Sequence, residues 1–189
     1  PEDAIDEDQR YELSLTNLEV EKMFRKMIQN WFKNPSARYN DFIKALFIND
    51  VDYMNEFMNQ MAEVTFSSFD TGNHPSDKAE PERFYHGFVL GLIVDLADRY
   101  QITSNRESGF GRYDVLLEPK KENDPAFVFE FKVYNPAKEN GLEEAADNAL
   151  KQIESKQYDA VLRARGIASE CIRHLGFAFE GKRVLIKES

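Results

Sequence analysis

The sequence predicts an α/β domain that follows a helical N-terminal region. Three observations predict it: apolar residues recur at helical spacing in the first half, β-branched and aromatic runs dominate the second, and a breaker-rich loop separates them. Of 189 residues, 42% are hydrophobic, which is enough for one domain with a core. We therefore expect an acidic, helical region over 1–78 and an α/β core over 79–189.

Apolar residues at helical spacing predict four helices in the first half of the chain. They cover about 18–32, 42–47, 53–61 and 82–96. Asn34-Pro35 and Asn49-Asp50 separate the first three, and a polar loop from 71 to 81 precedes the fourth. The methionine and aromatic stripes of these helices are expected to be core.

Short runs of β-branched and aromatic residues predict five strands in the second half. They cover about 100–105, 112–118, 126–133, 171–179 and 183–187. A helix at about 142–157 is expected between the third strand and the fourth, and Glu180-Gly181-Lys182 predicts a hairpin turn between the last two. The predicted order of the core is helix, three strands, helix, two strands.

Three charged residues lie inside these apolar strands. Asp114 falls on the second strand, while Glu130 and Lys132 fall on the third, where alternation puts them on one face about 7 Å apart. Buried charges are costly without a partner or an ion, so the sequence favours a site over a solvated pair. Two carboxylates can hold Mg²⁺, and the lysine can orient a water or stabilise phosphate charge.

The net charge of -10 argues against tight binding of nucleic acid. Several basic residues nevertheless lie near the proposed site in the sequence and predict a local basic rim. They are Arg99, Arg106, Arg112, Lys120, Lys121, Lys132 and Lys138. A basic rim of this kind is compatible with a negative total charge.

The single Cys171 cannot form an internal disulfide, and its apolar neighbours predict a buried thiol. No apolar run approaches the ~20 residues that span a bilayer, and the N-terminus is acidic. We expect a cytoplasmic protein without membrane contacts. Pro1 is an unusual first residue and is compatible with a fragment of a longer chain.

Four motifs carry a resemblance to a known family. They lie at 82–88, 107–114, 130–132 and 149–153. In this order they resemble the PD-(D/E)XK nuclease superfamily, and within it a bacterial branch of unknown function that usually follows an AAA-ATPase-like domain. The sequence contains no P-loop motif. The resemblance implies a restriction-endonuclease-like core, with a central mixed sheet flanked by helices.

The resemblance also implies roles for individual residues. Asp114 and Glu130 would bind Mg²⁺ or Mn²⁺, and Lys132 would position the attacking water or neutralise developing charge. Glu82 matches an acid on the first core helix that completes the site in many relatives. Gln152 matches a motif residue on the helix after the third strand, aimed back at the site.

Simpler alternatives remain for the residues at the edge of this site. Glu82 is equally explained as an acid that the helix dipole favours in a first turn, and Gln152 as an exposed helix residue. Arg112 either contacts phosphate or pairs with Glu107. His86 is expected to be a satisfied core histidine rather than a base.

The function predicted first is metal-dependent hydrolysis of DNA phosphodiester bonds. The alternative is a catalytically inactive interaction or regulatory module of the same fold, in which Glu130 and Lys132 form a structural ion pair. Hydrolysis of RNA or of a nucleotide is a third possibility. If the protein is active, DNA is the expected partner, bound weakly because of the net charge of -10, and the N-terminal helical region is a candidate homodimer interface.

Overall fold

The computed structural model describes residues 36–65, 80–122 and 124–189, and residues 35–189 form one compact unit. The predicted helix at 18–32 lies outside the described residues. The strands are β1 (Tyr100–Ser108), β2 (Gly111–Pro119), β3 (Ala126–Val133), β4 (Ile172–Glu180) and β5 (Arg183–Glu188). The helices are α2 (Ser36–Ile48), α3 (Val51–Thr65), α4 (Glu80–Ile93), α5 (Leu142–Lys156) and α6 (Ala160–Ala164), with 3-10 turns η1 (Val94–Asp98) and η2 (Ser169–Cys171).

The five strands form one mixed sheet in the order β1-β2-β3-β4-β5. The first three strands are antiparallel neighbours in chain order. Helix α5 then carries the chain to β4, which runs parallel to β3, and β5 returns antiparallel to β4. This mixed sheet with flanking helices confirms the predicted α/β fold, because an α-helical crossover is what a parallel pair of strands requires.

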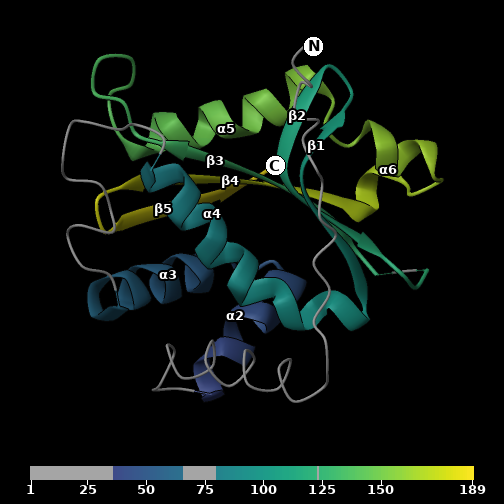
Figure 1. Ribbon diagram of the computed structural model, residues 1–189, viewed down its shortest axis with the longest axis horizontal. Coiled ribbons are helices and arrows are strands. Elements are labelled where there is room, and N and C mark those ends of the chain that lie inside the picture. The colour runs from purple at the N-terminus through teal and green to yellow at the C-terminus, as the bar shows by residue number, and fades with distance from the viewer. Residues whose placement is uncertain (1–35, 66–79, 123) are drawn as a thin grey trace, which may run out of the picture. The chain divides into compact units, whose positions relative to one another are not determined.

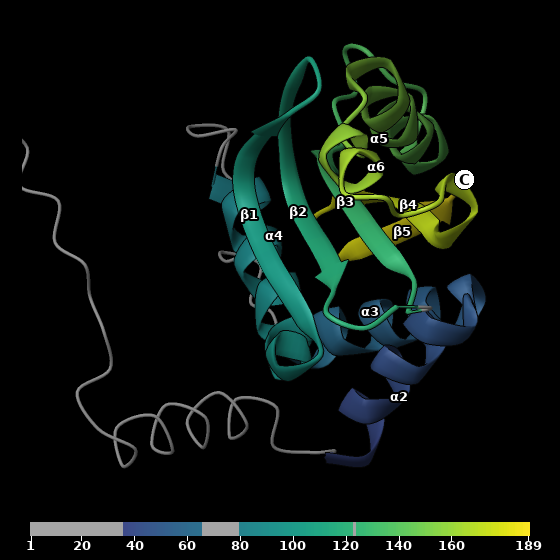
Figure 2. The same cartoon turned by 90° about the vertical axis from the view of Figure 1, so that its right-hand side faces the viewer.

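Helices cover both faces of the sheet, as Figures 1 and 2 show. Phe127, Phe129 and Phe131 of β3 point toward the face where α2, α3 and α4 pack, and all three are buried. Ala126 and Val128 point to the other face, where α5 and α6 pack. A single strand with apolar residues on both faces therefore serves two cores, which is why its sequence is almost continuously apolar.

Two asparagines of α3 cover the edge of the sheet at β5. Asn55 exchanges two hydrogen bonds with the backbone of Ile186, at 2.9 and 2.7 Å, and Asn59 exchanges two with Val184, at 2.7 and 3.0 Å. The asparagines are four residues apart, so they lie on the same side of the helix and match alternate residues of the strand. An edge strand that would otherwise present unpaired backbone groups is thereby satisfied within the chain.

Replacing Asn59 with Ala is expected to lower the free energy of unfolding by about 1–2 kcal/mol, because the Val184 N–H and C=O both lose their partner. Thermal unfolding followed by circular dichroism measures the change. The matched control is Glu63→Ala, an exposed position one turn further along α3. An equal effect of both substitutions would contradict the role given to Asn59.

Two details of the fold differ from the sequence predictions. Cys171 is exposed, because it lies in η2, before the first buried residue of β4. The short helix α6 was not predicted.

Helices α2 and α3 share a core with the sheet, while the predicted division between residues 78 and 79 stays a prediction. In the described part of the chain, no helix has both the length and the apolar character that crossing a bilayer demands.

Candidate active site

Two charged residues of β3 point away from its phenylalanine-rich face. The strand has the sequence AFVFEFKV, so alternation puts Glu130 and Lys132 on the face that α5 covers. Glu130 is only 3% exposed. Its Oε1 lies 3.7 Å from Lys132 Nζ, and the lysine side chain remains 26% exposed. Strand β3 therefore presents a buried carboxylate beside a partly exposed cation, as its sequence predicts.

Asp114 reaches the same place from β2. Its Oδ2 accepts a hydrogen bond from the Phe131 backbone N–H at 2.8 Å. Burial raises the pKa of Asp114, whereas hydrogen bonds with Phe131 and Glu130 and the charge of Lys132 act in the opposite direction. Two carboxyl groups thus meet in a partly buried place, where a bound cation would offset the cost of ionising both.

Gln152 of α5 makes hydrogen bonds to both charged side chains of β3, Glu130 and Lys132. Its Nε2 donates to Glu130 Oε1, and its Oε1 accepts from Lys132 Nζ at 2.6 Å. The amide also donates to the Tyr158 hydroxyl at 3.0 Å. The amide therefore has a fixed orientation, with its oxygen toward the ammonium, and Gln152 faces the site as the sequence motif implied.

Helix α5 can bring Gln152 to Glu130 because β4 has a glycine at the closest approach. Gly176 is the register partner of Glu130 on β4. A Cβ at Gly176 would stand 2.6 Å from the Ala146 carbonyl oxygen and 3.1 Å from Ala149 Cβ. The helix backbone therefore packs directly on the strand at this point, and no larger residue fits without moving the helix.

Tyr158, which the sequence analysis missed, supports Gln152 by accepting a hydrogen bond from its amide. It is buried after the end of α5, and its ring packs edge-on to Tyr113 with centroids 6.5 Å apart. Burial raises the pKa of Tyr158, and the nearby carboxylates Glu130 and Asp114 raise it further, so the hydroxyl is protonated at neutral pH. A tyrosine beyond the end of a helix carries no signal in the spacing of residues, which is why only the structure reveals it.

Replacing Tyr158 with Phe is expected to lower the free energy of unfolding by about 1 kcal/mol, because the Gln152 amide loses one of its hydrogen bonds. Thermal unfolding followed by circular dichroism would measure the change. The control is Tyr134→Phe, in the loop after β3. An equal effect of both substitutions would contradict the role given to Tyr158.

The opposite wall of the site comes from α4 and β1. Ser104 Oγ lies 2.8 Å from His86 Nε2, and Asn105 Nδ2 lies 3.3 Å from His86 Nδ1. Burial lowers the pKa of His86, although Asp114 raises it in part. A neutral His86 that accepts at Nδ1 and donates at Nε2 satisfies both contacts. The histidine is therefore satisfied as expected, but it lines the site rather than the core.

These residues enclose a pocket of about 620 Å³. Its lining consists of His86, Asn105, Arg112, Asp114, Glu130, Phe131, Lys132, Val133 and Gln152. Arg112 lies at its rim and is also the register partner of Glu107 on β1. Seven of these nine residues have a charged, amide or imidazole side chain, so the pocket suits a polar, charged ligand.

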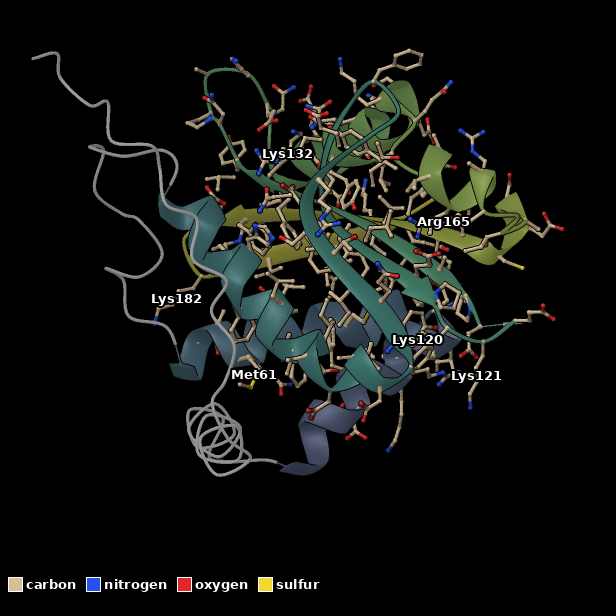
Figure 3. The ribbon with its side chains drawn as sticks, turned by 45° about the vertical axis from the view of Figure 1, so that its right-hand side comes forward. Met61, Lys120, Lys121, Lys132, Arg165 and Lys182 are labelled. Atoms are coloured by element: carbon tan, nitrogen blue, oxygen red, sulfur yellow. The ribbon has the colours of Figure 1, made fainter. Side chains whose placement is uncertain are left out.

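The basic rim predicted from the sequence is wrong in part. Figure 3 shows Lys120 and Lys121 at the opposite end of the sheet from Lys132. The reason is strand direction: Lys120 comes six residues after Asp114, which at ~3.4 Å per residue is about 20 Å along β2. Arg99 is also engaged elsewhere, in an ion pair with Asp124. Of the seven predicted rim residues, only Arg112 and Lys132 line the pocket.

The site combines an acid on the second strand, an E-x-K on the third and a glutamine on the following helix. The sequence profile of the PD-(D/E)XK nuclease superfamily matches residues 80–189. The chain belongs to this superfamily. Among curated proteins no match to the sequence was found. The PD-(D/E)XK profile begins at the first residue of α4 and spans the whole sheet, so it covers every residue that lines the pocket.

PD-(D/E)XK nucleases generally use divalent metals, and the donor set here fits one. Asp114 and Glu130 supply carboxylate oxygens, the ligands that hard cations prefer. In the described part of the chain no group of three His, Cys, Asp or Glu side chains could hold a metal. Glu82, the third candidate acid, lies on α4, but its side chain is outside the described part, so its role stays a prediction.

Proposed function

We propose that this protein is a metal-dependent nuclease that hydrolyses DNA phosphodiester bonds. The observation that carries the proposal is the convergence of Asp114, Glu130, Lys132 and Gln152, from three different elements, on one polar pocket. Membership of the PD-(D/E)XK superfamily supports nuclease chemistry, and the residue types at these positions fit the roles that the sequence resemblance implies. The choice of DNA over RNA or a nucleotide is part of the proposal.

In the proposed mechanism the carboxylates of Asp114 and Glu130 would hold Mg²⁺ or Mn²⁺. When bound, the ion would lower the pKa of a water so that it can attack phosphorus, and would act as a Lewis acid. Lys132 stabilises the negative charge that develops on the phosphate oxygens. Gln152 holds the Lys132 ammonium at 2.6 Å, so the cation is already in place when the substrate arrives.

The low affinity expected for DNA follows from charge. With a net charge of -10, the chain lacks the broad positive field that brings phosphates to a protein, and binding should weaken further as salt rises. Arg112 at the pocket rim is the proposed phosphate contact. A cytoplasmic location and membership of the branch that usually follows an AAA-ATPase-like domain remain predictions, and nothing among the described residues supports the homodimer.

One observation favours the alternative, an inactive interaction module with the same fold. Glu130, Gln152 and Lys132 already contact one another: Oε1 of Glu130 accepts from Gln152 and lies 3.7 Å from the lysine. In an inactive relative this network would be a closed structural ion pair. The two functions therefore differ in whether the carboxylates bind a metal ion.

Metal binding is tested by thermal unfolding with and without Mg²⁺ or Mn²⁺. Ion at tenfold its Kd would stabilise the native protein by about 1.4 kcal/mol, or about 3–6 °C in Tm. Asp114→Asn should abolish this rise. No rise for the wild type with either metal, together with no cleavage of DNA or RNA at low salt, would favour the inactive module.

The Asp114→Asn substitution also has an expected effect on the melting temperature when no metal is present. A raised pKa means that the Asp114 carboxyl contributes most to stability below its unfolded pKa and that this contribution is lost as pH rises through the folded pKa. Asn cannot ionise, so Asp114→Asn at neutral pH should melt no lower than the wild type in EDTA. A much lower Tm would instead identify Asp114 as a structural residue.

A further inference from the structure

The turn between β1 and β2 lies at one end of the sheet (Figure 2). Its Phe110 has an exposed aromatic side chain. Gly109, with φ of 60°, and Phe110 are its central residues, because Ser108 and Gly111 pair across it. A glycine with positive φ at the first central position is typical of a type II′ turn, in which polar residues are usual. Phe110 is 73% exposed and contributes to neither core.

The turn packs against the end of α5. The Phe110 backbone N–H donates to the Lys156 carbonyl at the end of α5, at 2.7 Å. A Cβ on Gly109 would stand 2.2 Å from that carbonyl oxygen and 2.3 Å from the Gln157 carbonyl oxygen. The turn therefore sits directly on the end of the helix, and the exposed ring projects from a supported backbone.

The turn is also joined to the active site. Gly111 packs on Tyr158, where a Cβ would stand 3.0 Å from the ring, and Tyr158 holds Gln152. Along β2, Asp114 comes four residues after Phe110, a distance of about 14 Å at ~3.4 Å per residue. A stacked nucleic-acid strand rises about 3.4 Å per nucleotide, so this distance corresponds to about four nucleotides.

The surroundings of the ring suit nucleic acid better than a protein partner. Arg106 on β1 and Arg112 on β2 are exposed near the turn, and one acid, Glu107 on β1, is the register partner of Arg112. Among the described residues, the other exposed large apolar side chains are Ile48 of α2 and Val94 of η1, neither of which lines the pocket. A single ring is too small for a protein interface of about 800 Å² per partner, but it matches the face of one base.

We infer that Phe110 stacks on an unpaired base of the bound DNA strand, a few nucleotides from the phosphate at the carboxylates, while Arg112 contacts a phosphate between them. The inference rests on the proposed nuclease function. Stacking on an aromatic ring is independent of base identity, so it would add affinity without sequence specificity. It would also supply affinity that the negative net charge does not.

The test measures binding of labelled oligodeoxythymidine and of an abasic oligonucleotide of equal length by fluorescence anisotropy. All proteins carry Lys132→Met to prevent cleavage and comprise residues 1–189. Adding Phe110→Ala is expected to weaken binding of the thymidine oligonucleotide about 10-fold and to leave binding of the abasic one unchanged. Phe110→Trp should retain the affinity. Ile48→Ala, which removes an equally exposed apolar side chain (73%), is the matched control.

The outcomes separate this inference from the proposed function. Equal binding of the thymidine oligonucleotide with and without Phe110, or equal losses on both oligonucleotides, would overturn the inference and leave the nuclease proposal to its own cleavage test. If Phe110→Ala weakened binding of the thymidine oligonucleotide alone and the wild type cleaved no substrate, the result would support the inference and count against catalysis. Failure of the parent protein to bind either oligonucleotide would overturn the inference, and absence of cleavage by the wild type would then overturn the nuclease proposal as well.

Discussion

Replacing Lys132 with Met is expected to lower kcat for DNA cleavage by about 10²–10³-fold, or about 3–4 kcal/mol in the activation free energy. Methionine keeps an unbranched apolar side chain but removes the ammonium that Gln152 holds at 2.6 Å. The loss is large because a positioned charge acts on the transition state, where negative charge on the phosphate oxygens is greatest. Single-turnover cleavage of a labelled DNA in Mg²⁺ would measure it.

Comparing Lys132→Met with Asp114→Asn separates the role of the lysine in charge stabilisation from that of the carboxylate in metal binding. In Lys132→Met both Asp114 and Glu130 remain, so the rise in Tm with Mg²⁺ should persist, whereas Asp114→Asn should lose both the rise and the cleavage. Lys138→Met is the matched control for charge, because Lys138 is exposed in the loop after β3. Cleavage by Lys132→Met within a few-fold of the wild type would contradict the proposed role of the lysine.

Much of the sheet was predictable from the sequence, because its strands have strong local signals. Strand β3 runs from Ala126 to Val133, as predicted, since eight residues of which only Glu130 and Lys132 are polar suit a strand buried on both faces. Alternation alone placed Glu130 and Lys132 together. The convergence of Asp114 on them follows from the antiparallel register of β2 and β3.

What the sequence missed depends on contacts between distant segments. Tyr158 acts through Gln152, and the side of the site formed by His86 depends on how α4 crosses β1. The prediction for Lys120 is wrong because residues close in sequence need not be close in space: β2 runs away from the site toward Lys120. Cys171 is exposed because a 3-10 turn, which has no periodicity to detect, precedes β4.

Gly176→Ala is expected to lower the free energy of unfolding by about 3 kcal/mol, the upper end of the cost of overpacking a core. The added Cβ would stand 2.6 Å from the Ala146 carbonyl oxygen, and a helix backbone cannot yield as a flexible side chain can. For a domain of this size the loss corresponds to about 6–12 °C in Tm. Because α5 must move away from β4, Gln152 should also lose its position beside Glu130, and kcat for cleavage should fall with stability.

Gly87→Ala gives the matched control for this substitution. Gly87 lies in α4 and nothing would come within 4 Å of an added Cβ, so Ala should stabilise the protein by about 0.5–1 kcal/mol through the unfolded state and the helix propensity. The same Gly→Ala substitution is therefore expected to lower the free energy of unfolding at position 176 and to raise it at position 87. If Gly176→Ala were as neutral as a surface change while cleavage persisted, close contact between α5 and β4 would not be what positions Gln152.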